Sequence, residues 1–224
     1  LVYPYGPVYG EIGKECRYTQ FGRELSSKGY SVIWWTANFS HSSKEYRKVS
    51  DSVINVCENF TTVLVPTKSY KRNISIGRVL FERSFARNLK KHFSNSEKPD
   101  IIIVAGTGMF NAFEPCISFA KNNNIPLIYD IMDVSLVESY FNQRHRLLSP
   151  LVMSIMKIER YRERTFFEYI CGISALGKNQ LTYAKKRAFN REVPSCIVYN
   201  SINVHSIRKD MQFEDVSNLL GNKA

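Results

Sequence analysis

Two acidic side chains, Asp130 and Asp133, follow an apolar run at residues 126–129. Another apolar run, at residues 101–104, is followed by Thr107 between two glycines. Short runs bounded in this way are typical of strands buried on both faces of a parallel sheet. Polar residues at the carboxyl ends of such strands lie where open α/β sheets bind ligands. Carboxylates at that edge can orient a bound hydroxyl or accept its proton. The alternative for each is a carboxylate that caps a helix or closes a loop.

A glycine-rich loop at residues 6–14 contains Gly10, Gly13 and Lys14 and precedes a helical pattern at residues 16–28. A loop of this kind can present free backbone N–H groups to an anion at the start of a helix. It does not match the phosphate-binding P-loop, because Val8 and Glu15 stand where that motif has glycine and serine or threonine. The sequence therefore leaves open a phosphate cradle and a plain tight turn.

A polar loop at residues 37–47 follows a predicted strand at residues 30–36 and gathers His41, Lys44 and Arg47. The loop lies at the carboxyl end of that strand, so these side chains are candidates for the same edge of the sheet. A histidine in a loop is also commonly just solvated, and both interpretations of His41 stay open.

Composition is that of an ordinary globular protein, with 224 residues of which 44% are hydrophobic and 23% charged. No apolar run approaches the roughly 20 residues that span a bilayer, and no signal peptide is recognisable. Five cysteines are scattered without a CxxC pair, which favours a reduced cytosolic protein with mostly buried thiols over a disulfide or zinc scaffold. No metal site is predicted.

Positive charge is the strongest compositional signal, with a net charge of +11. Residues 140–191 hold eleven Lys and Arg against three Glu, which gives this segment +8. Such a surface indicates nucleic acid, anionic lipid or a phosphorylated ligand, and a plain solvated surface is the alternative. The residues predicted to face an anionic surface are Arg144, Arg146, Arg160, Arg162 and Arg164.

Strand and helix patterns alternate along most of the chain, which predicts a single Rossmann-like, doubly wound, mainly parallel α/β sheet of about six to seven strands flanked by helices. The clearest helix is amphipathic, because Phe81, Phe85, Leu89 and Phe93 recur every four residues. Packing on the sheet is the main interpretation of that helix, and lying on a membrane surface is the alternative. Predicted strands are residues 1–5, 30–36, 101–104, 126–129, 170–174 and 195–199, and residues 53–57 and 61–65 are predicted as either a hairpin or one strand with its lead-in. Predicted helices are residues 16–28, 78–93, 109–121, 151–169 and 179–189.

Several local patterns together resemble the N-terminal domain of GT-B glycosyltransferases, specifically the family-4 retaining enzymes that build bacterial surface polysaccharides. The order and spacing of the patterns carry the resemblance, which spans residues 1–204. After the glycine loop, the matching segments are residues 25–32, with Lys28-Gly29-Tyr30, 99–104, 126–133, 168–174 and 198–203, with Asn200-Ser201. Residues 39–47 also resemble a subgroup of polysaccharide-assembly transferases.

Two departures from the family pattern bear on function. Val134 and Ser135 stand where many relatives have Trp-Pro. The second Rossmann domain, with its paired glutamates, does not follow residue 204. The resemblance therefore implies that residues 1–204 are the acceptor-binding half of the enzyme. It also implies that residues 205–224 are a linker towards an absent domain, and that this fragment alone is inactive.

The resemblance implies a hexosyltransferase that moves a sugar from a nucleotide sugar to a polysaccharide or lipid-linked oligosaccharide, with retention of anomeric configuration. Catalytic candidates, which would orient or deprotonate the acceptor, are His41, Asp130 and Asp133. Candidates for donor diphosphate are Gly10, Glu11, Gly13, Lys14 and Arg17. Candidates for the acceptor are Lys44, Arg47, Thr107 and Asn200.

The resemblance also implies the partners and the location. The nucleotide sugar is the co-substrate, bound mostly by the absent domain, and no other cofactor is expected. A lipid-linked acceptor on an anionic membrane suits the basic segment, which predicts a cytoplasmic protein peripheral to the inner face of the cell membrane. Nucleic acid is not expected, because no recognised nucleic-acid module is present. The alternative is a stand-alone basic α/β module that binds a nucleotide, nucleic acid or partner protein without catalysis.

Overall fold

The computed structural model describes residues 1–11, 16–48, 51–73, 75–106, 113–133, 158, 161–162, 164–188 and 191–200. The predicted site residues that lie outside them are Gly13, Lys14, Thr107, Arg144, Arg146 and Arg160.

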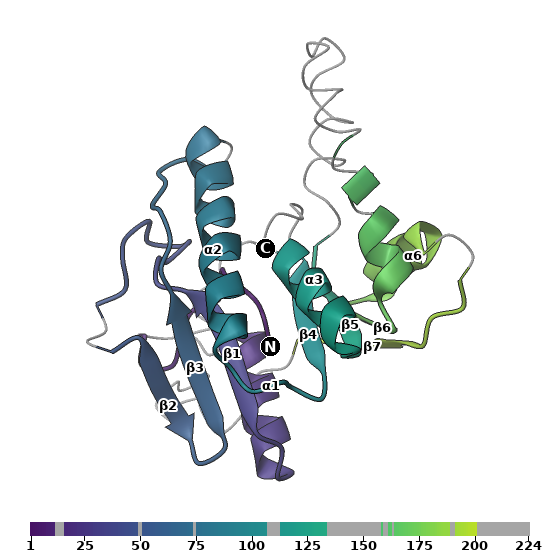
Figure 1. The fold of residues 1–224 in the computed structure, drawn as a ribbon, viewed down its shortest axis with the longest axis horizontal. Helices are drawn as coiled ribbons and strands as arrows, with labels where there is room; N and C mark the ends of the chain where they lie inside the picture. Colours follow the sequence, from purple (N-terminus) through teal and green to yellow (C-terminus); the bar gives the residue numbers. More distant parts are fainter. Residues whose placement is uncertain are drawn as a thin grey trace, which may run out of the picture.

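In the described part of the chain, seven strands run through the middle of the molecule in two hydrogen-bonded groups, ordered β1-β3-β2 and β4-β5-β6-β7 (Figure 1). All pairings are parallel except that of β2 with β3, which is a hairpin. The strands are β1 (Val32–Ala37), β2 (Val53–Cys57), β3 (Phe60–Val65), β4 (Ile102–Gly106), β5 (Leu127–Ile131), β6 (Gly172–Ala175) and β7 (Ser195–Ile197). Of the two interpretations of residues 53–65, the structure shows the hairpin. The predicted parallel α/β sheet is confirmed.

Val2 joins the two groups of strands, because it forms parallel bridges with Trp35 of β1 and Val104 of β4. The Val2 N–H donates to the Ile103 carbonyl at 2.9 Å, and the Tyr3 N–H donates to the Trp35 carbonyl at 3.1 Å. The strand predicted at residues 1–5 is thus reduced to a two-sided bridge at Val2. Val2 nevertheless lies between β1 and β4 and links the two groups of strands by hydrogen bonds.

Helices cover the two faces of the sheet unequally (Figure 1). On one face, aromatic and aliphatic side chains of α2 and α3 join those of α6 and residues 166–170 in one buried cluster. The other face carries α1, whose buried Tyr18 packs with Trp34 and Phe60 in a smaller cluster. The helices are α1 (Arg17–Ser27), α2 (Ile76–Ser94), α3 (Glu114–Asn123) and α6 (Lys178–Arg187).

The amphipathic pattern of α2 is confirmed as a packing face. Phe81, Phe85, Leu89 and Phe93 are all buried, as four-residue spacing places them on one side of the helix. Ser75 is the N-cap of the helix, and its hydroxyl accepts a hydrogen bond from the Arg78 N–H at 3.2 Å.

Two glycines allow close packing that no other residue would allow. A Cβ on Gly22 of α1 would lie 2.3 Å from the Phe60 ring, and a Cβ on Gly106 would lie 2.0 Å from the Tyr129 hydroxyl oxygen. The sequence pattern predicts that Gly106 follows the strand, but Gly106 is the last residue of β4. The absence of a side chain at each position lets the neighbouring aromatic ring approach the backbone.

Two sequence predictions are corrected by the fold. Asp130 does not follow its strand but lies inside β5, opposite Ala105 of β4 and Ser174 of β6. The thiols are not mostly buried: Cys116 is buried and Cys16 half-buried, but the other three are exposed. Two of the exposed thiols, Cys57 and Cys196, lie on the outermost strands β2 and β7, where fewer neighbours cover a side chain. All five cysteines are free.

None of the helices in the described part of the chain is long and apolar enough to cross a membrane.

Candidate functional site

A buried ion pair lies beneath the carboxyl edge of the sheet and joins α1 to β5. Arg17 donates from Nε to Asp130 Oδ2 at 3.0 Å and from Nη2 to Oδ1 at 3.1 Å. The Tyr18 hydroxyl donates to Asp130 Oδ2 at 2.5 Å. Burial, together with the neighbouring Asp130 charge, raises the pKa of Tyr18 well above its usual value, so the phenol keeps its proton. The Asp130 carboxylate is 0% exposed and is held by three donors.

The same arginine reaches the end of the last strand. Arg17 Nη1 donates to the Val198 carbonyl at 2.6 Å and lies 3.5 Å from Asn200 Oδ1. Three predicted site residues, Arg17, Asp130 and Asn200, are therefore brought together from positions far apart in the chain. Asp133 lies beyond the end of β5 and is exposed.

A second arginine holds the glycine loop against the polar loop that follows β1. Arg47 donates from Nε to the Ala37 carbonyl at 2.8 Å and from Nη2 to the Gly6 carbonyl at 2.6 Å. Arg47 Nη1 also forms an ion pair with Glu11, whose Oε2 accepts from the Val8 N–H at 3.1 Å. The residues predicted separately for donor and acceptor, Glu11 and Arg47, are thus partners of each other.

Gly10 turns the chain in this loop with a φ of +87°, a backbone conformation that favours glycine. A Cβ there would meet no atom of the described residues within 4 Å, and the requirement for glycine comes from the backbone conformation. Outside this turn the loop runs on into residues 12–15, which the structure does not describe.

A third cluster contains the predicted residues His41 and Lys44 and connects the polar loop to the segment before α2. Lys44 Nζ lies 3.3 Å from His41 Nδ1 and donates to Asn73 Oδ1 at 2.6 Å. The Tyr70 hydroxyl also contacts His41 Nδ1. Because an ammonium group only donates hydrogen bonds, Nδ1 is the accepting nitrogen, and a neutral ring then carries its proton on Nε2.

His41 is held in the neutral form. Burial, followed by the charges of Lys44 and Arg78, lowers the pKa of His41 from 6.5 to about 4. Near pH 7 the imidazole is therefore a hydrogen-bond donor through Nε2, and it is a weak base.

Arg78 and Glu82 complete this third cluster and were not found from the sequence. Arg78 Nε lies 3.4 Å from Glu82 Oε1, and the Tyr5 hydroxyl donates to the same carboxylate oxygen at 2.5 Å. The spacing of an arginine and a glutamate four residues apart on a helix was a signal that could have identified the pair. Tyr5 is 77 residues away from Glu82, and no local pattern connects them.

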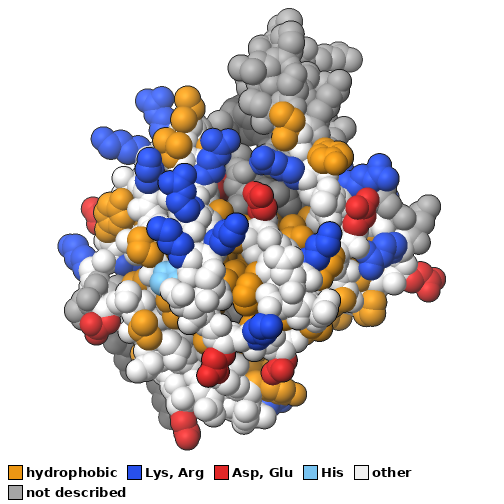
Figure 2. Space-filling model, in the orientation of Figure 1, with side chains coloured by type: hydrophobic (Ala, Val, Ile, Leu, Met, Phe, Trp, Pro, Cys, Tyr) orange, Lys and Arg blue, Asp and Glu red, His pale blue; other side chains and the backbone are white. Residues whose placement is uncertain are grey.

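Two surface cavities lie away from these three clusters. One, of about 340 Å³, lies between α2, α3 and Arg162, and is lined by Arg83, Ala86, Arg87, Lys90, Glu114, Pro115, Ser118 and Arg162. Figure 2 shows Lys and Arg side chains gathered over α2 on this face. Of the predicted anionic-surface residues, Arg162 lines this groove, whereas Arg164 is exposed and pairs with Glu168 at 3.3 Å.

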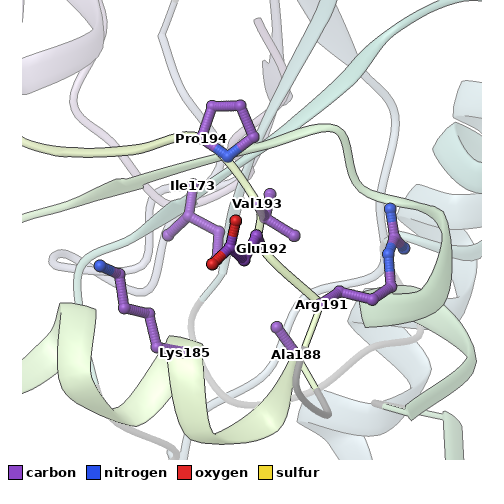
Figure 3. A pocket seen from close by; sticks show the side chains of 7 residues that line it. All are labelled: Ile173, Lys185, Ala188, Arg191, Glu192, Val193 and Pro194. Carbon is purple, nitrogen blue, oxygen red and sulfur yellow. The ribbon is translucent and has the colours of Figure 1, made fainter.

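The other cavity, of about 520 Å³, lies beside α6 and the segment that leads into β7 (Figure 3). Its charged side chains are Lys185, Arg191 and Glu192. Because Pro194 pairs with Ile173 at the start of β6, this cavity lies at the amino edge of the sheet, away from the predicted site residues. Among the described residues, no group of histidine, cysteine and acidic side chains could hold a metal ion.

No protein-family model matches the chain, and no curated protein sequence matches it. Two structures of sucrose-phosphate synthase from Thermosynechococcus elongatus are similar to it, each at 11% sequence identity over 90% of this chain. For one of them the TM-score is 0.53, and this chain spans 88% of its length. The other has a TM-score of 0.61, and this chain spans 47% of its length. Sucrose-phosphate synthase is a GT-B glycosyltransferase. The structural similarity therefore shows that this chain has a Rossmann-like α/β fold of the kind found in GT-B glycosyltransferases.

Proposed function

We propose that the chain is the N-terminal, acceptor-side domain of a GT-B glycosyltransferase of the family-4 retaining type. The complete enzyme transfers a sugar from a nucleotide sugar to a growing polysaccharide or lipid-linked oligosaccharide, as in bacterial surface-polysaccharide synthesis. The observation that carries the proposal is the convergence of three polar clusters, centred on Arg17, Arg47 and Lys44, in loops and strand ends of a GT-B-like sheet. Ligands of open α/β sheets bind at that carboxyl edge.

Glycosyl transfer releases a diphosphate and develops positive charge on the sugar, so the enzyme must hold negative charge and orient the attacking hydroxyl. In our proposal the glycine loop, with Gly10, Gly13 and Lys14, approaches the donor diphosphate. Glu11 and Arg47 support this role by tying the loop to the carbonyls of Gly6 and Ala37. The nucleotide sugar is the co-substrate, and the proposed reaction calls on no further cofactor.

Asp133 is the carboxylate proposed to face the acceptor, because it is exposed beyond the end of β5. Thr107, the next residue in the sequence after β4, is also proposed to bind the acceptor. Asp130 is proposed as a positioning residue and not as a base, because its buried carboxylate is occupied by Arg17 and Tyr18. Asp130 holds Arg17, and Arg17 in turn lies beside the Asn200 side chain and would position it.

We further propose that the domain docks on the anionic cytoplasmic face of a membrane through the groove between α2 and α3. Four cationic side chains line this groove against one acidic side chain, Glu114. Ile76 and Leu80 of α2 are exposed apolar side chains, and so are Ile158 and Tyr161, which precede Arg162 in the chain. Cations beside exposed apolar groups are typical of surfaces that bind anionic lipid, where each Lys or Arg contributes about 1 kcal/mol.

The decisive experiment measures nucleoside diphosphate release by the protein encoded by the complete gene. The protein is incubated with a panel of nucleotide sugars, with and without lipid-linked oligosaccharides extracted from membranes. We expect release that depends on the acceptor, and a product whose anomeric proton coupling matches that of the donor sugar. Release without retention would reject the family-4 assignment. Absence of acceptor-dependent release from every donor, with binding of a nucleotide or partner protein instead, would support a non-catalytic module.

A further inference from the structure

Lys44, His41 and Arg78 approach one another although they come from two separate segments. Asn73 lies between the two cations: its side-chain oxygen accepts from Lys44 Nζ at 2.6 Å and its backbone carbonyl accepts from Arg78 Nη1 at 3.3 Å. Lys44 Nζ also lies 4.4 Å from the centre of the Tyr70 ring. The polar loop after β1 and the start of α2 therefore both donate hydrogen bonds to Asn73.

The positive charge of this cluster is only partly neutralised. Its one carboxylate, Glu82, is buried and is bound by Arg78 and by the Tyr5 hydroxyl. Within the described residues, no carboxylate lies within ion-pair distance of Lys44. Burial and then the charge of Arg78 lower the pKa of Lys44. Burial, followed by the charges of Lys44 and Arg78, lowers the pKa of His41. An anion that entered the cluster would relieve this repulsion.

The backbone holds Lys44 in an uncommon conformation that aims its side chain at the cluster. Its φ is +61°, in the left-handed region that residues other than glycine seldom occupy. The turn is closed by hydrogen bonds from the Lys44 N–H to the Ser40 carbonyl at 3.0 Å and from the Ser40 N–H to the Glu45 carbonyl at 2.8 Å. Backbone strain of this kind is common where a side chain must be pre-positioned for a ligand.

We propose that Lys44, together with the Nε2–H of His41 and the guanidinium of Arg78, binds a phosphate or diphosphate group of the acceptor. Ammonium and guanidinium groups only donate hydrogen bonds, and such charged donors suit an ionised phosphate. The first turn of α2 adds the positive end of a 19-residue helix beside it. In this assignment His41 donates to the ligand and removes no proton. The acceptor role rests on the proposed function, whereas the anion site itself does not.

The test is an NMR titration of the 224-residue chain with inorganic pyrophosphate, following the ring protons of His41. The chain has four histidines, so the His41 signal is assigned with His41→Gln. We expect saturable binding that raises the pKa of His41 by one unit or more, because the anion offsets Lys44 and Arg78. Lys44→Gln should weaken binding at least tenfold, and Lys44→Arg should retain most of it. Lys91→Gln removes the same charge from an exposed position on α2 and should leave binding unchanged.

The site is overturned if pyrophosphate leaves the His41 signal unchanged, or if Lys44→Gln and Lys91→Gln weaken binding equally. Two further ligands identify the source of the phosphate: a polyprenyl diphosphate in detergent micelles and a free sugar phosphate. Tighter binding of the polyprenyl diphosphate supports a lipid-linked acceptor, and tighter binding of the sugar phosphate supports a soluble one. Pyrophosphate binding without any sugar transfer by the complete enzyme would overturn the proposed function while supporting the anion site. Transfer that is unaffected by Lys44→Gln would overturn the acceptor role of the site.

Discussion

Arg17 and Asp130 form a two-pronged buried ion pair that fastens the first helix to the fifth strand, with both donor–acceptor distances close to 3 Å. The residues are 113 positions apart in the chain. Both side chains are almost fully buried, so each charge depends on the other for compensation.

Asp130→Asn should lower the free energy of unfolding by about 3–5 kcal/mol, because it leaves the Arg17 charge buried without its partner. Urea unfolding followed by circular dichroism measures this change. Glu24→Gln is the matched control, since it removes a carboxylate from the exposed Lys28–Glu24 pair. That change should cost less than about 1 kcal/mol. Equal losses for the two variants would contradict the structural role of Asp130.

Gly22→Ala should destabilise the fold by about 1–3 kcal/mol, because the added Cβ would overlap the Phe60 ring. Phe60→Leu removes that ring and leaves a smaller side chain. The double variant should therefore be more stable than the sum of the two single effects predicts. Strict additivity in thermal or urea unfolding would show that the close packing of α1 on β3 is incorrect.

The low pKa of His41 predicts a loss of stability in mild acid. The pKa of this ring is about 4 in the folded chain and 6.5 in the unfolded chain, so the unfolded chain binds the extra proton first. The stability that the neutral His41 ring contributes is fully present above pH 6.5, and it is lost as the pH decreases towards 4. Free energies of unfolding between pH 7.5 and 5 measure the slope.

His41→Gln should make this pH dependence shallower. Burial also lowers the pKa of His92, which lies on α2 beside Trp35, so His92 contributes a slope of the same sign. Comparing His41→Gln, His92→Gln and the double variant separates the two. If His41→Gln leaves the slope unchanged, the histidine is not held neutral in the fold.

Reversing charge in the groove between α2 and α3 should release the domain from anionic vesicles. Arg83→Glu and Arg87→Glu are expected to weaken co-sedimentation with phosphatidylglycerol vesicles about fivefold or more each, from roughly 1 kcal/mol per cation. Lys28→Glu is the control, because α1 lies on the opposite face of the sheet. Binding should also fall with added salt and should be absent with uncharged phosphatidylcholine vesicles. Equal effects of Arg83→Glu and Lys28→Glu would argue against a defined docking face.

The amino-acid sequence alone determined the alternation of strands and helices and the class of fold. These features depend on local patterns: unbroken apolar runs became β4 and β5, and four-residue spacing placed Phe81 and Phe85 of α2 in the core. Glycine, asparagine and proline marked most turns. The sequence also identified several polar residues that lie near the carboxyl edge, because those residues follow strands directly.

Only the tertiary structure decided which of these residues contact each other and which face a ligand. Asp130 lies inside a strand and beneath Arg17, and no short-range pattern distinguishes this position from the exposed one of Asp133. Glu82 likewise binds the Tyr5 hydroxyl across 77 residues. Such partners come together when helices pack on opposite faces of the sheet, and burial then sets the protonation of Tyr18 and His41. Contacts between distant segments follow from how the elements pack, and local residue spacing does not encode them.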